Sequence, residues 1–525
     1  MRFCERSWRL EVRVSNFEFR THTVLATFHI ENFGCRATQA DAAAIERQLA
    51  ERGFARAGGA EDVDVVIVNT CTVTASADSQ ARQAIRRIHR ESPRAQIIAT
   101  GCYAQRAPEE LAAIEGVSWV VGNSHKPEIP TLVEQELLPV QRMPSHFFPA
   151  ALLNRAQVVP KLREPAPHEQ LSLARAPAKI LTGNIFEQNA VLVAPVLGGE
   201  GGRTRPVLKI QDGCNHRCAY CVIPFVRGRS RSLPPQEVIA EIRKLCDAGY
   251  KEVVLSGINL GSYGRDLVSR VEFLELVRLI LAETPLARLR ISSIEPMDVT
   301  QDLVELVASS NRIARHFHIP LQSGSDRILA AMHRWYRAAH YARRLELIRE
   351  LLPGAAIGAD VIVGFPGETD DDHRATIRFI EALPFTYLHV FAFSKRPGTE
   401  AARLLEAERV PEVSPRVIKQ RSAELRALAA SKSAAFRAAQ VGKTLRVLTL
   451  EKSGETWTEA LSDNYLKVRL PGSWPANEFV DVRVTADGGS WLLAEPLTSA
   501  TEAPSHRIFQ KTIESDTGFA AVARL

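Results

Sequence analysis

The chain has 525 residues, of which 24% are charged, and a formal net charge of +6. That length exceeds one hydrophobic core and indicates about three domains. No apolar run approaches the roughly 18 residues of a membrane span, and the first residues lack the apolar region of a secretory signal, so we expect a soluble, cytoplasmic protein. The mild positive charge permits a nucleic-acid partner without requiring one.

Residues 1–25 show no usable pattern and are assigned only as an N-terminal extension. Within 26–138, three apolar runs alternate with helical patterns, of which the clearest spans 38–52 and is followed by Gly53. The runs cover 27–33, 63–69 and 95–100. Strands that alternate with helices in this way predict an open parallel α/β sheet.

A cysteine follows each of these three expected strands: Cys35, Cys71 and Cys102. In open α/β sheets, ligands gather outside the carboxyl ends of the strands, so thiols that are distant in sequence would meet at one edge. The alternative is that each is a small buried residue, because free cysteine packs well in cores. The repeated strand-end position, with Gly or Thr beside each thiol, favours an iron–sulfur cluster.

No period is sustained from 139 to 203, and we expect a linker or insertion there. Within 204–436, six apolar runs then alternate with helical patterns, at 207–211, 252–256, 289–293, 316–321, 357–363 and 387–394. Six such units predict a partial (β/α)6 barrel, whose ligands would lie at the C-terminal mouth of the strands.

Three further cysteines, Cys214, Cys218 and Cys221, follow the first barrel strand at spacings of four and three. The four irons of a [4Fe–4S] cluster each take a thiolate, so three cysteines would leave one iron open to a small molecule. A structural zinc knuckle is the alternative. Zinc sites usually bring two pairs of ligands, and His216 lies between the cysteines, where loop geometry disfavours a fourth ligand. The spacing therefore favours a cluster with an open iron.

The C-terminal part predicts a small all-β barrel. A helical pattern over about 413–439 leads into short alternating strands within 437–498, broken by glycines and a Pro-Gly pair. Basic and aromatic side chains of the kinds that bind RNA occur there, although a solvated β surface carries similar residues. They are Lys443, Arg446, Trp457, Tyr465, Lys467 and Arg469. Residues 499–525 form a C-terminal tail without a pattern.

The C-x3-C-x2-C motif, with Tyr220 before its last cysteine, resembles that of the radical S-adenosylmethionine (SAM) enzymes. Over roughly 26–495 the chain resembles the methylthiotransferases within that superfamily, and it is most similar to the bacterial tRNA enzymes that act on N6-threonylcarbamoyladenosine. Seven segments carry the likeness, at 69–74, 100–105, 223–228, 292–296, 319–324, 363–368 and 395–399.

The resemblance implies two [4Fe–4S] clusters, an auxiliary one on Cys35, Cys71 and Cys102 and the radical-SAM one on Cys214, Cys218 and Cys221. It also implies a methylthiotransferase N-terminal domain over 26–138, a radical-SAM core over 204–436 and a TRAM domain, an OB-like barrel, over 437–498.

The implied reaction adds a methylthio group to C2 of N6-threonylcarbamoyladenosine at position 37 of tRNA, next to the anticodon, and uses two SAM molecules per turnover. One SAM methylates a sulfur held at the auxiliary cluster, and the other is cleaved to a radical. Expected partners are the anticodon stem-loop and an electron donor such as flavodoxin or ferredoxin. We name no catalytic residue beyond the cluster ligands, because acid–base groups cannot replace the C2 hydrogen by sulfur.

SAM is expected to bind across the barrel mouth, where small and polar residues at strand ends would let backbone groups reach the adenosyl moiety. The candidates are Ser256, Gly257, Ser292, Ser293, Gln322 and Asp360. Ordinary barrel-loop chemistry explains each of them equally well. Two other cysteines are left out of the sites: Cys246 falls in a helical pattern and Cys4 in the extension.

Two alternatives stay open. A methylthiotransferase of a related branch would act on isopentenyladenosine of tRNA or on an aspartate of a ribosomal protein. A non-enzymatic iron–sulfur protein would carry electrons or bind RNA, but electron carriers ordinarily have fully ligated clusters. Formation of 5′-deoxyadenosine from SAM separates the enzyme from the carrier.

Overall fold

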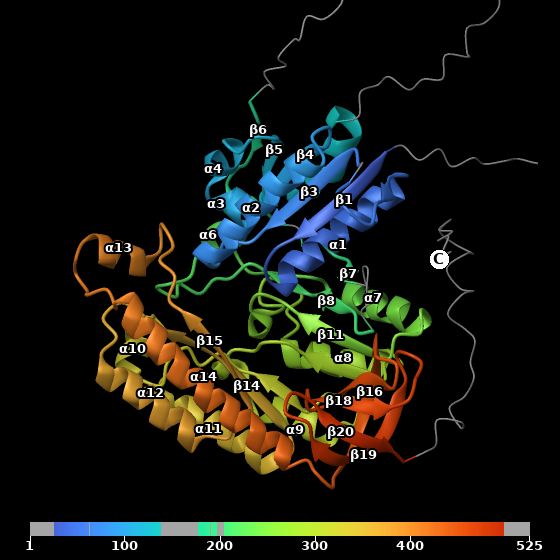
Figure 1. Cartoon of the computed structure of the whole chain (residues 1–525), viewed down its shortest axis with the longest axis vertical. Helices are drawn as coiled ribbons and strands as arrows, with labels where there is room; N and C mark the ends of the chain where they lie inside the picture. Colours follow the sequence, from blue (N-terminus) through green and yellow to red (C-terminus); the bar gives the residue numbers. More distant parts are fainter. Residues whose placement is uncertain (1–25, 62, 138–176, 190, 197–203, 498–525) are drawn as a thin grey trace, which may run out of the picture.

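The structure is a computed structural model that describes residues 26–61, 63–137, 177–189, 191–196 and 204–497. A parallel α/β sheet near the N-terminus lies against a central partial barrel, and a small closed β-barrel follows near the C-terminal end (Figure 1). This order confirms the fold class expected from the sequence. Among the described residues, no helix is both long and apolar enough to cross a membrane.

The N-terminal sheet has six parallel strands in the order β2-β1-β3-β4-β5-β6. Their bounds are β1 Thr27–Asn32, β2 Ala55–Arg56, β3 Val65–Thr70, β4 Gln96–Gly101, β5 Val117–Gly122 and β6 Lys179–Leu181. Helices cover both faces: α1 (Arg36–Glu51) and α5 (Ile129–Leu132) one of them, and α2 (Ala75–Glu91), α3 (Cys102–Arg106) and α4 (Pro108–Ala112) the other.

Every residue of β3 is buried because both faces of the sheet are covered. The two-residue period of the strand sends alternate side chains to opposite cores. Val66 and Val68 pack with Ile85 of α2, whereas Val65 and Ile67 pack with α1. The thiols that follow these strands are therefore carried on a rigid sheet.

The central barrel is built from two groups of three parallel strands. The first is β8 (Val207–Lys209), β11 (Glu252–Ser256) and β12 (Arg288–Ile291), and the second is β13 (His316–His318), β14 (Ala356–Val363) and β15 (Tyr387–Ala392). Isolated bridges, Leu289 to Ile313 and Ser293 to His318, join the two groups. The result is the open, six-unit barrel that the sequence predicts.

The helices of this region connect or flank the barrel strands. They are α6 Ile223–Arg227, α7 Pro235–Asp247, α8 Phe273–Glu283, α9 Gln301–Ser309, α10 Asp326–Ala331, α11 Ala338–Leu351, α12 Asp370–Ala382, α13 Glu400–Glu406 and α14 Pro415–Ala438. The Ser414 side chain caps α14 by accepting a hydrogen bond from the Val417 amide, which fits the helix expected at 413–439.

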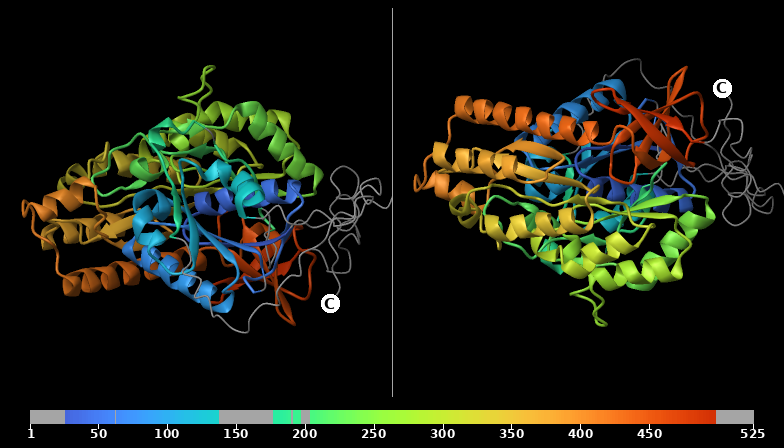
Figure 2. Two further views of the ribbon diagram at one scale, coloured as in Figure 1. Left: turned by 90° about the horizontal axis from the view of Figure 1, so that it is seen from above. Right: turned by 90° about the horizontal axis from the view of Figure 1, so that it is seen from below.

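The C-terminal barrel is closed, in the strand order β16-β17-β18-β20-β19. Its strands are β16 Thr444–Ser453, β17 Trp457–Ser462, β18 Lys467–Pro471, β19 Phe479–Asp487 and β20 Leu492–Pro496. It attaches near the N-terminal ends of the central strands, where Arg290 donates hydrogen bonds to the carbonyls of Ser462 and Asp463, each at 3.0 Å. All views place it at the opposite end of the molecule from α13 (Figures 1 and 2).

The range 139–203, expected as an unpatterned linker or insertion, contains two short strands that the sequence did not reveal. β6 pairs with β5 in the N-terminal sheet, and β7 (Pro195–Val196) pairs antiparallel with β8. Runs of two or three residues are too short to show a period, so pairing with a neighbouring sheet defines them. The extension 1–25, Cys4 and the tail 499–525 lie outside the described residues.

Candidate iron–sulfur and SAM site

The structure brings Cys35, Cys71 and Cys102 to the carboxyl ends of three adjacent strands. β1 and β4 flank β3, with Asn32 paired to Asn69 and Thr70 paired to Gly101. Because parallel strands end at the same edge, the residues that follow them meet there. The structure therefore confirms that Cys35, Cys71 and Cys102 meet at one edge of the sheet, as the sequence predicts.

Two glycines allow this edge to close around the thiols. Gly34 has a φ of +105°, and a Cβ added to it would lie 2.7 Å from the Cys71 Sγ. Gly101 has a φ of +103°, and its added Cβ would lie 2.2 Å from the Thr70 carbonyl oxygen. Both positions need a left-handed backbone and the absence of a side chain.

The second group of thiols lies on the loop after β8 and β9 (Gln211–Asp212). Cys214, Cys218 and Cys221 are all partly exposed. The Arg334 guanidinium donates a hydrogen bond to the Cys218 Sγ at 3.3 Å and pairs with Glu295. The His216 backbone amide donates to the Cys214 Sγ at 3.4 Å. The loop thus supplies hydrogen-bond donors for thiolates.

The spacing of the thiols favours clusters over single ions. Tetrahedral zinc with Zn–S bonds of about 2.3 Å would hold its sulfurs about 3.8 Å apart. Across the described part of the chain, the one trio of potential ligands whose atoms all lie within 4.8 Å is His318, Asp360 and His389, which contains no cysteine. His216 does not complete such a group with its neighbouring thiols either. Thiolates that bind different irons of one cubane are held farther apart.

The thiols nevertheless act on one another. Burial raises the pKa of Cys71 to about 12, and the charges of Cys102 and Cys35 add to the effect. Burial likewise raises the pKa of Cys221 to about 12, with further contributions from Cys218 and Cys214. The protonation states of the thiols within each trio are therefore coupled. A bound cation would favour the deprotonated thiolates.

A cavity of about 260 Å³ is lined by Cys221 of the second group of thiols and by its neighbour Tyr220. Val73 and Thr74, which follow Cys71 closely in the chain, form another part of its wall, whereas Cys35, Cys71 and Cys102 do not line it. The remaining lining comes from α6 and the strand ends: Val222, Ile223, Gln322, Asp360, Ile362, Phe391, Ala392, Phe393 and Ser394. A mainly apolar chamber with a few polar groups is typical of a small-molecule site.

Two of the six SAM candidates, Gln322 and Asp360, line this cavity. Gln322 has a φ of +65°, and its backbone pairs with β14 on both sides, from its amide to Asp360 and from the Ile362 amide to its carbonyl. Ser256 and Gly257 lie at the end of β11, and Ser292 and Ser293 after β12, outside the cavity lining. All six remain predictions as SAM contacts.

Asp360 is held by two imidazoles. Its Oδ1 lies 3.1 Å from the His318 Nε2 and 3.2 Å from the His389 Nδ1. Burial acts to raise the pKa of Asp360, but these two hydrogen bonds outweigh it and keep the pKa well below its usual range. An ionised carboxylate therefore stands in the cavity wall.

Buried cations near the thiols were not identified from the sequence. Arg396, from the loop after β15, bonds to the Thr72 hydroxyl at 3.0 Å and pairs with Asp78. Arg227 ends α6 and pairs with Asp41 and Asp212. Arg227 and Arg396 lie in two of the segments that carry the family likeness, 223–228 and 395–399, but those motifs assign no role to either side chain. Asn123 and Arg334, which contact thiols, lie outside all seven segments, so no motif in the sequence points to them.

The basic and aromatic residues of the C-terminal barrel divide into two groups. Lys443, Arg446 and Lys467 are exposed. Arg469 lies between two indoles, 4.0 Å from the Trp457 ring centre and 3.4 Å from that of Trp491. Tyr465 instead stacks on His316 of the central barrel at 4.5 Å, so it is an interdomain contact. Its expected place among RNA-binding side chains is not supported.

Comparisons with known proteins agree with this geometry. A model of the radical SAM superfamily matches residues 208–380, and one described as uncharacterized protein family UPF0004 matches residues 27–122. The chain is similar to the TsrM radical SAM methyltransferase of Kitasatospora setae, whose structure holds cobalamin and a [4Fe–4S] cluster. That similarity has a TM-score of 0.50 and 18% identity over 74% of this chain and 79% of that one, and it concerns the fold alone.

Three relatives match at the sequence level. Threonylcarbamoyladenosine tRNA methylthiotransferase MtaB of Bacillus subtilis is 34% identical over 88% of this chain and 98% of its own length. MtaB of Aquifex aeolicus is 34% identical over 86% and 99%. The tRNA-2-methylthio-N(6)-dimethylallyladenosine synthase of Chlorobium chlorochromatii is 32% identical over 90% and 98%.

With this near-complete coverage, the chain belongs to the methylthiotransferase family of radical-SAM enzymes. Such an enzyme uses SAM and two [4Fe–4S] clusters. The residues present fit those groups: there are two trios of thiols, each too widely spaced for one ion, and Gly34 leaves room beside Cys71. Each trio is one thiolate short of filling a cubane.

Replacing Gly34 by Ala should displace the Cys71 thiol, because the added methyl group would overlap it and the backbone would be strained. We expect the reconstituted variant to lose about half of its iron and to keep SAM cleavage. Iron analysis and 5′-deoxyadenosine measurement test this, with Gly442→Ala as the control, since that glycine has a similar φ of +82° and nothing within 4 Å of the added Cβ. An undiminished iron content in Gly34→Ala would contradict the assignment of a cluster to the thiols at this edge of the sheet.

Proposed function

We propose that this enzyme adds a methylthio group to C2 of N6-threonylcarbamoyladenosine at position 37 of tRNA. The observation that carries the proposal is the cavity that Cys221 of one trio lines together with Val73 and Thr74, which follow Cys71 of the other trio closely in the chain. A chamber whose walls come from both thiol-bearing segments suits a reaction that joins a sulfur from one centre to a carbon activated at the other. The proposed substrate is taken from the names of the MtaB relatives, which are 34% identical to this chain over nearly their whole length.

In this proposal Cys35, Cys71 and Cys102 hold the auxiliary cluster, and Cys214, Cys218 and Cys221 hold the radical-SAM cluster. When bound, the clusters supply the electron that cleaves SAM and the site that holds the transferred sulfur. The resemblance carries this division over residue by residue, and the two separate trios of mutually interacting thiols support it.

The chain's own residues shape the chamber. Apolar side chains such as Ile362 and Phe393 limit water, which would quench a radical. Gln322 and Asp360 offer polar atoms for SAM or the base, and the two imidazoles keep Asp360 ionised and fixed. Holding the reacting groups in one orientation accounts for a large part of such a rate enhancement.

The substrate within the family is the finer part of the proposal. A relative named for dimethylallyladenosine is 32% identical, so the related branch is the second candidate. Both candidates are tRNA bases next to the anticodon, and the anticodon stem-loop is the proposed partner. The proposed compartment is the cytoplasm, with flavodoxin or ferredoxin as the electron donor.

We further propose the domain limits 26–138, with β6 as a strand added from the following segment, 204–436 and 437–498, with the last as a TRAM domain that binds tRNA. Its surface offers the Trp457–Arg469–Trp491 stack beside a shallow pocket of about 300 Å³. Exposed Lys443 and Lys467 would meet phosphates. Stacking and basic side chains together are how small β-barrels hold RNA.

Cysteine variants test the proposed function and its division of labour. Cys214→Ala should abolish SAM cleavage, whereas Cys71→Ala should still form 5′-deoxyadenosine but yield no methylthio product. The assay uses tRNA from a strain that lacks the enzyme and nucleoside mass spectrometry. A methylthio product from the Cys71 variant would contradict the division, and a product on isopentenyladenosine alone would contradict the substrate.

Trp457→Ala and Trp491→Ala should each weaken tRNA binding about tenfold, because one base stack contributes about 1–3 kcal/mol. Binding to full-length reconstituted enzyme measures this. Trp119→Ala is the matched control, since that indole makes a cation–π contact with Lys179 in the N-terminal sheet. Equal affinities of all three variants for tRNA would contradict the proposal that the two indoles of the C-terminal barrel bind RNA.

A further inference from the structure

Buried charges between the N-terminal sheet and the central barrel do not balance. Four cations, Lys126, Lys209, Arg227 and Arg231, surround two carboxylates, Asp41 and Asp212, and the side chains of all six are at least nine-tenths buried. Among the described residues, this set carries a surplus of two positive charges. A buried charge without a counter-charge is costly, so a negative partner is expected nearby.

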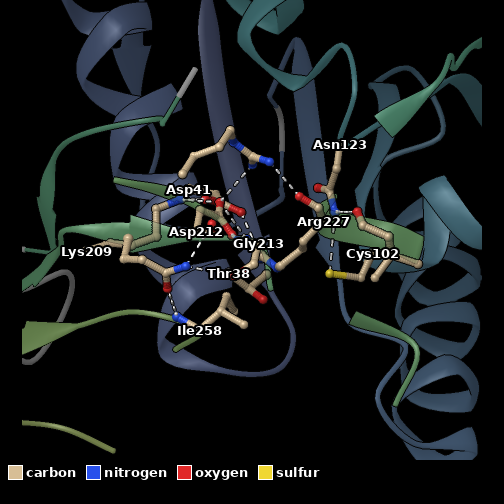
Figure 3. A network of polar contacts seen from close by, with 12 residues as sticks. Thr38, Asp41, Cys102, Asn123, Lys209, Asp212, Gly213, Arg227 and Ile258 are labelled. Carbon is tan, nitrogen blue, oxygen red and sulfur yellow. Dashed lines mark hydrogen bonds and ion pairs between the residues drawn. The ribbon is translucent and has the colours of Figure 1, made fainter. Parts of the chain in front are cut away.

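Arg227 occupies the centre of this network (Figure 3). Its Nη1 donates to both carboxylate oxygens of Asp212, at 2.9 and 3.0 Å, and its Nη2 donates to Asp41 at 3.0 Å. Asp212 stands two residues before Cys214, and Asp41 lies on α1, which begins just after Cys35. One guanidinium thus ties together the two loops that carry the thiols.

The third nitrogen of this guanidinium, Nε, is buried and has no hydrogen-bond partner among the described residues. The other two nitrogens of the Arg227 guanidinium both donate to the carboxylates. The Nε atoms of Arg334, Arg396, Arg421 and Arg469 are unpartnered in the same way, so this atom alone fits a bound water as well as a ligand. The surplus positive charge around Arg227 is what indicates an absent anionic group.

The segment that carries Arg227 packs against one of the auxiliary thiols, Cys102. Val222 and Val226 of this segment pack on Cys102. The Asn123 side-chain amide donates to the Val226 carbonyl at 2.7 Å and to the Cys102 Sγ at 3.5 Å (Figure 3). Burial acts against the charged form of Arg227, but Asp212 and Asp41, with smaller contributions from Cys102 and Cys35, hold its pKa well above its usual range.

We propose that Arg227 is the counter-cation of the auxiliary cluster and that Asn123 is a hydrogen-bond donor to its Cys102 ligand. The pair are positioning residues, which act on the cluster through charge and through its thiolate. The inference rests on the proposed assignment of Cys35, Cys71 and Cys102 to that cluster. Arg227 also ends the five-residue helix α6 that starts two residues after Cys221, so the segment that carries it connects to both trios of thiols.

The predicted consequence is a higher reduction potential for the auxiliary cluster. Net charge and hydrogen bonds to sulfur set the potential of an iron–sulfur cluster, and a nearby cation favours the reduced, more negative form. Arg334, which donates to the Cys218 Sγ, has the corresponding place beside the other trio. Each centre therefore has its own buried arginine, and their effects should be separable.

The test measures the potential of each cluster alone by EPR-monitored redox titration of the full chain. One background carries Cys214, Cys218 and Cys221 changed to Ala, and keeps only the auxiliary cluster. The other carries Cys35, Cys71 and Cys102 changed to Ala. Into each we introduce Arg227→Met, Arg227→Lys, Asn123→Ala and Arg334→Met, with iron content and circular dichroism measured for every sample.

In the auxiliary-only background, Arg227→Met should lower the ratio of reduced to oxidised cluster at least tenfold at a fixed potential, which equals about 59 mV for a one-electron couple. Arg227→Lys keeps the charge and should shift the ratio less than threefold. Asn123→Ala should shift it in the same direction as Arg227→Met. Arg334→Met should shift only the radical-SAM cluster.

An unshifted auxiliary potential in Arg227→Met, or a shift of equal size in Arg227→Lys, would overturn the inference. If Arg227→Met does not fold or does not bind iron, the Arg227→Lys and Asn123→Ala variants decide. The inference is supported if Arg227→Lys binds iron and Asn123→Ala lowers the potential of the auxiliary cluster. Any other result overturns the inference. Failure of the proposed function looks different, because the auxiliary-only background would then hold no cluster before any of these changes.

Discussion

Ion pairs buried between α1 and the central barrel join the two segments that carry the trios of thiols. Asp41 belongs to α1, which covers the N-terminal sheet, and Lys209, Asp212 and Arg227 belong to the central barrel and its loops. Isolated buried charges would be strongly unfavourable, so each depends on the others staying in place. Burial would raise the pKa of Asp41, but Arg227, Lys126 and Lys209 keep it well below its usual range. The geometry of the reaction chamber follows from this contact.

The two trios then differ in what surrounds them. The first trio lies on three neighbouring strand ends of a sheet covered on both faces, with Cys71 and Cys102 buried and Cys35 exposed. The other trio lies on one loop at the barrel mouth, where all three thiols are partly exposed. The first trio is therefore carried by a rigid sheet and the second by a single loop. The C-terminal barrel sits at the far ends of the central strands and leaves the mouth free.

Much of this could be predicted from the sequence because it depends on local pattern. Alternating apolar runs gave the strands, and the strand-end rule placed Cys35, Cys71 and Cys102 at one edge. What failed depended on tertiary contacts. β6 and β7 are too short to show a period, and Tyr465 looked like an RNA-binding side chain until its ring proved to stack on His316. Asn123 follows β5 without any motif, so only the fold shows that its amide reaches Cys102.

Mössbauer spectroscopy of the full-length, anaerobically reconstituted chain, with and without SAM, is the decisive measurement. We expect about eight irons per chain in two [4Fe–4S] clusters, only one of which changes its spectrum when SAM binds its open iron. Zinc at either trio of thiols, a single cluster, or spectra that do not respond to SAM would contradict this expectation.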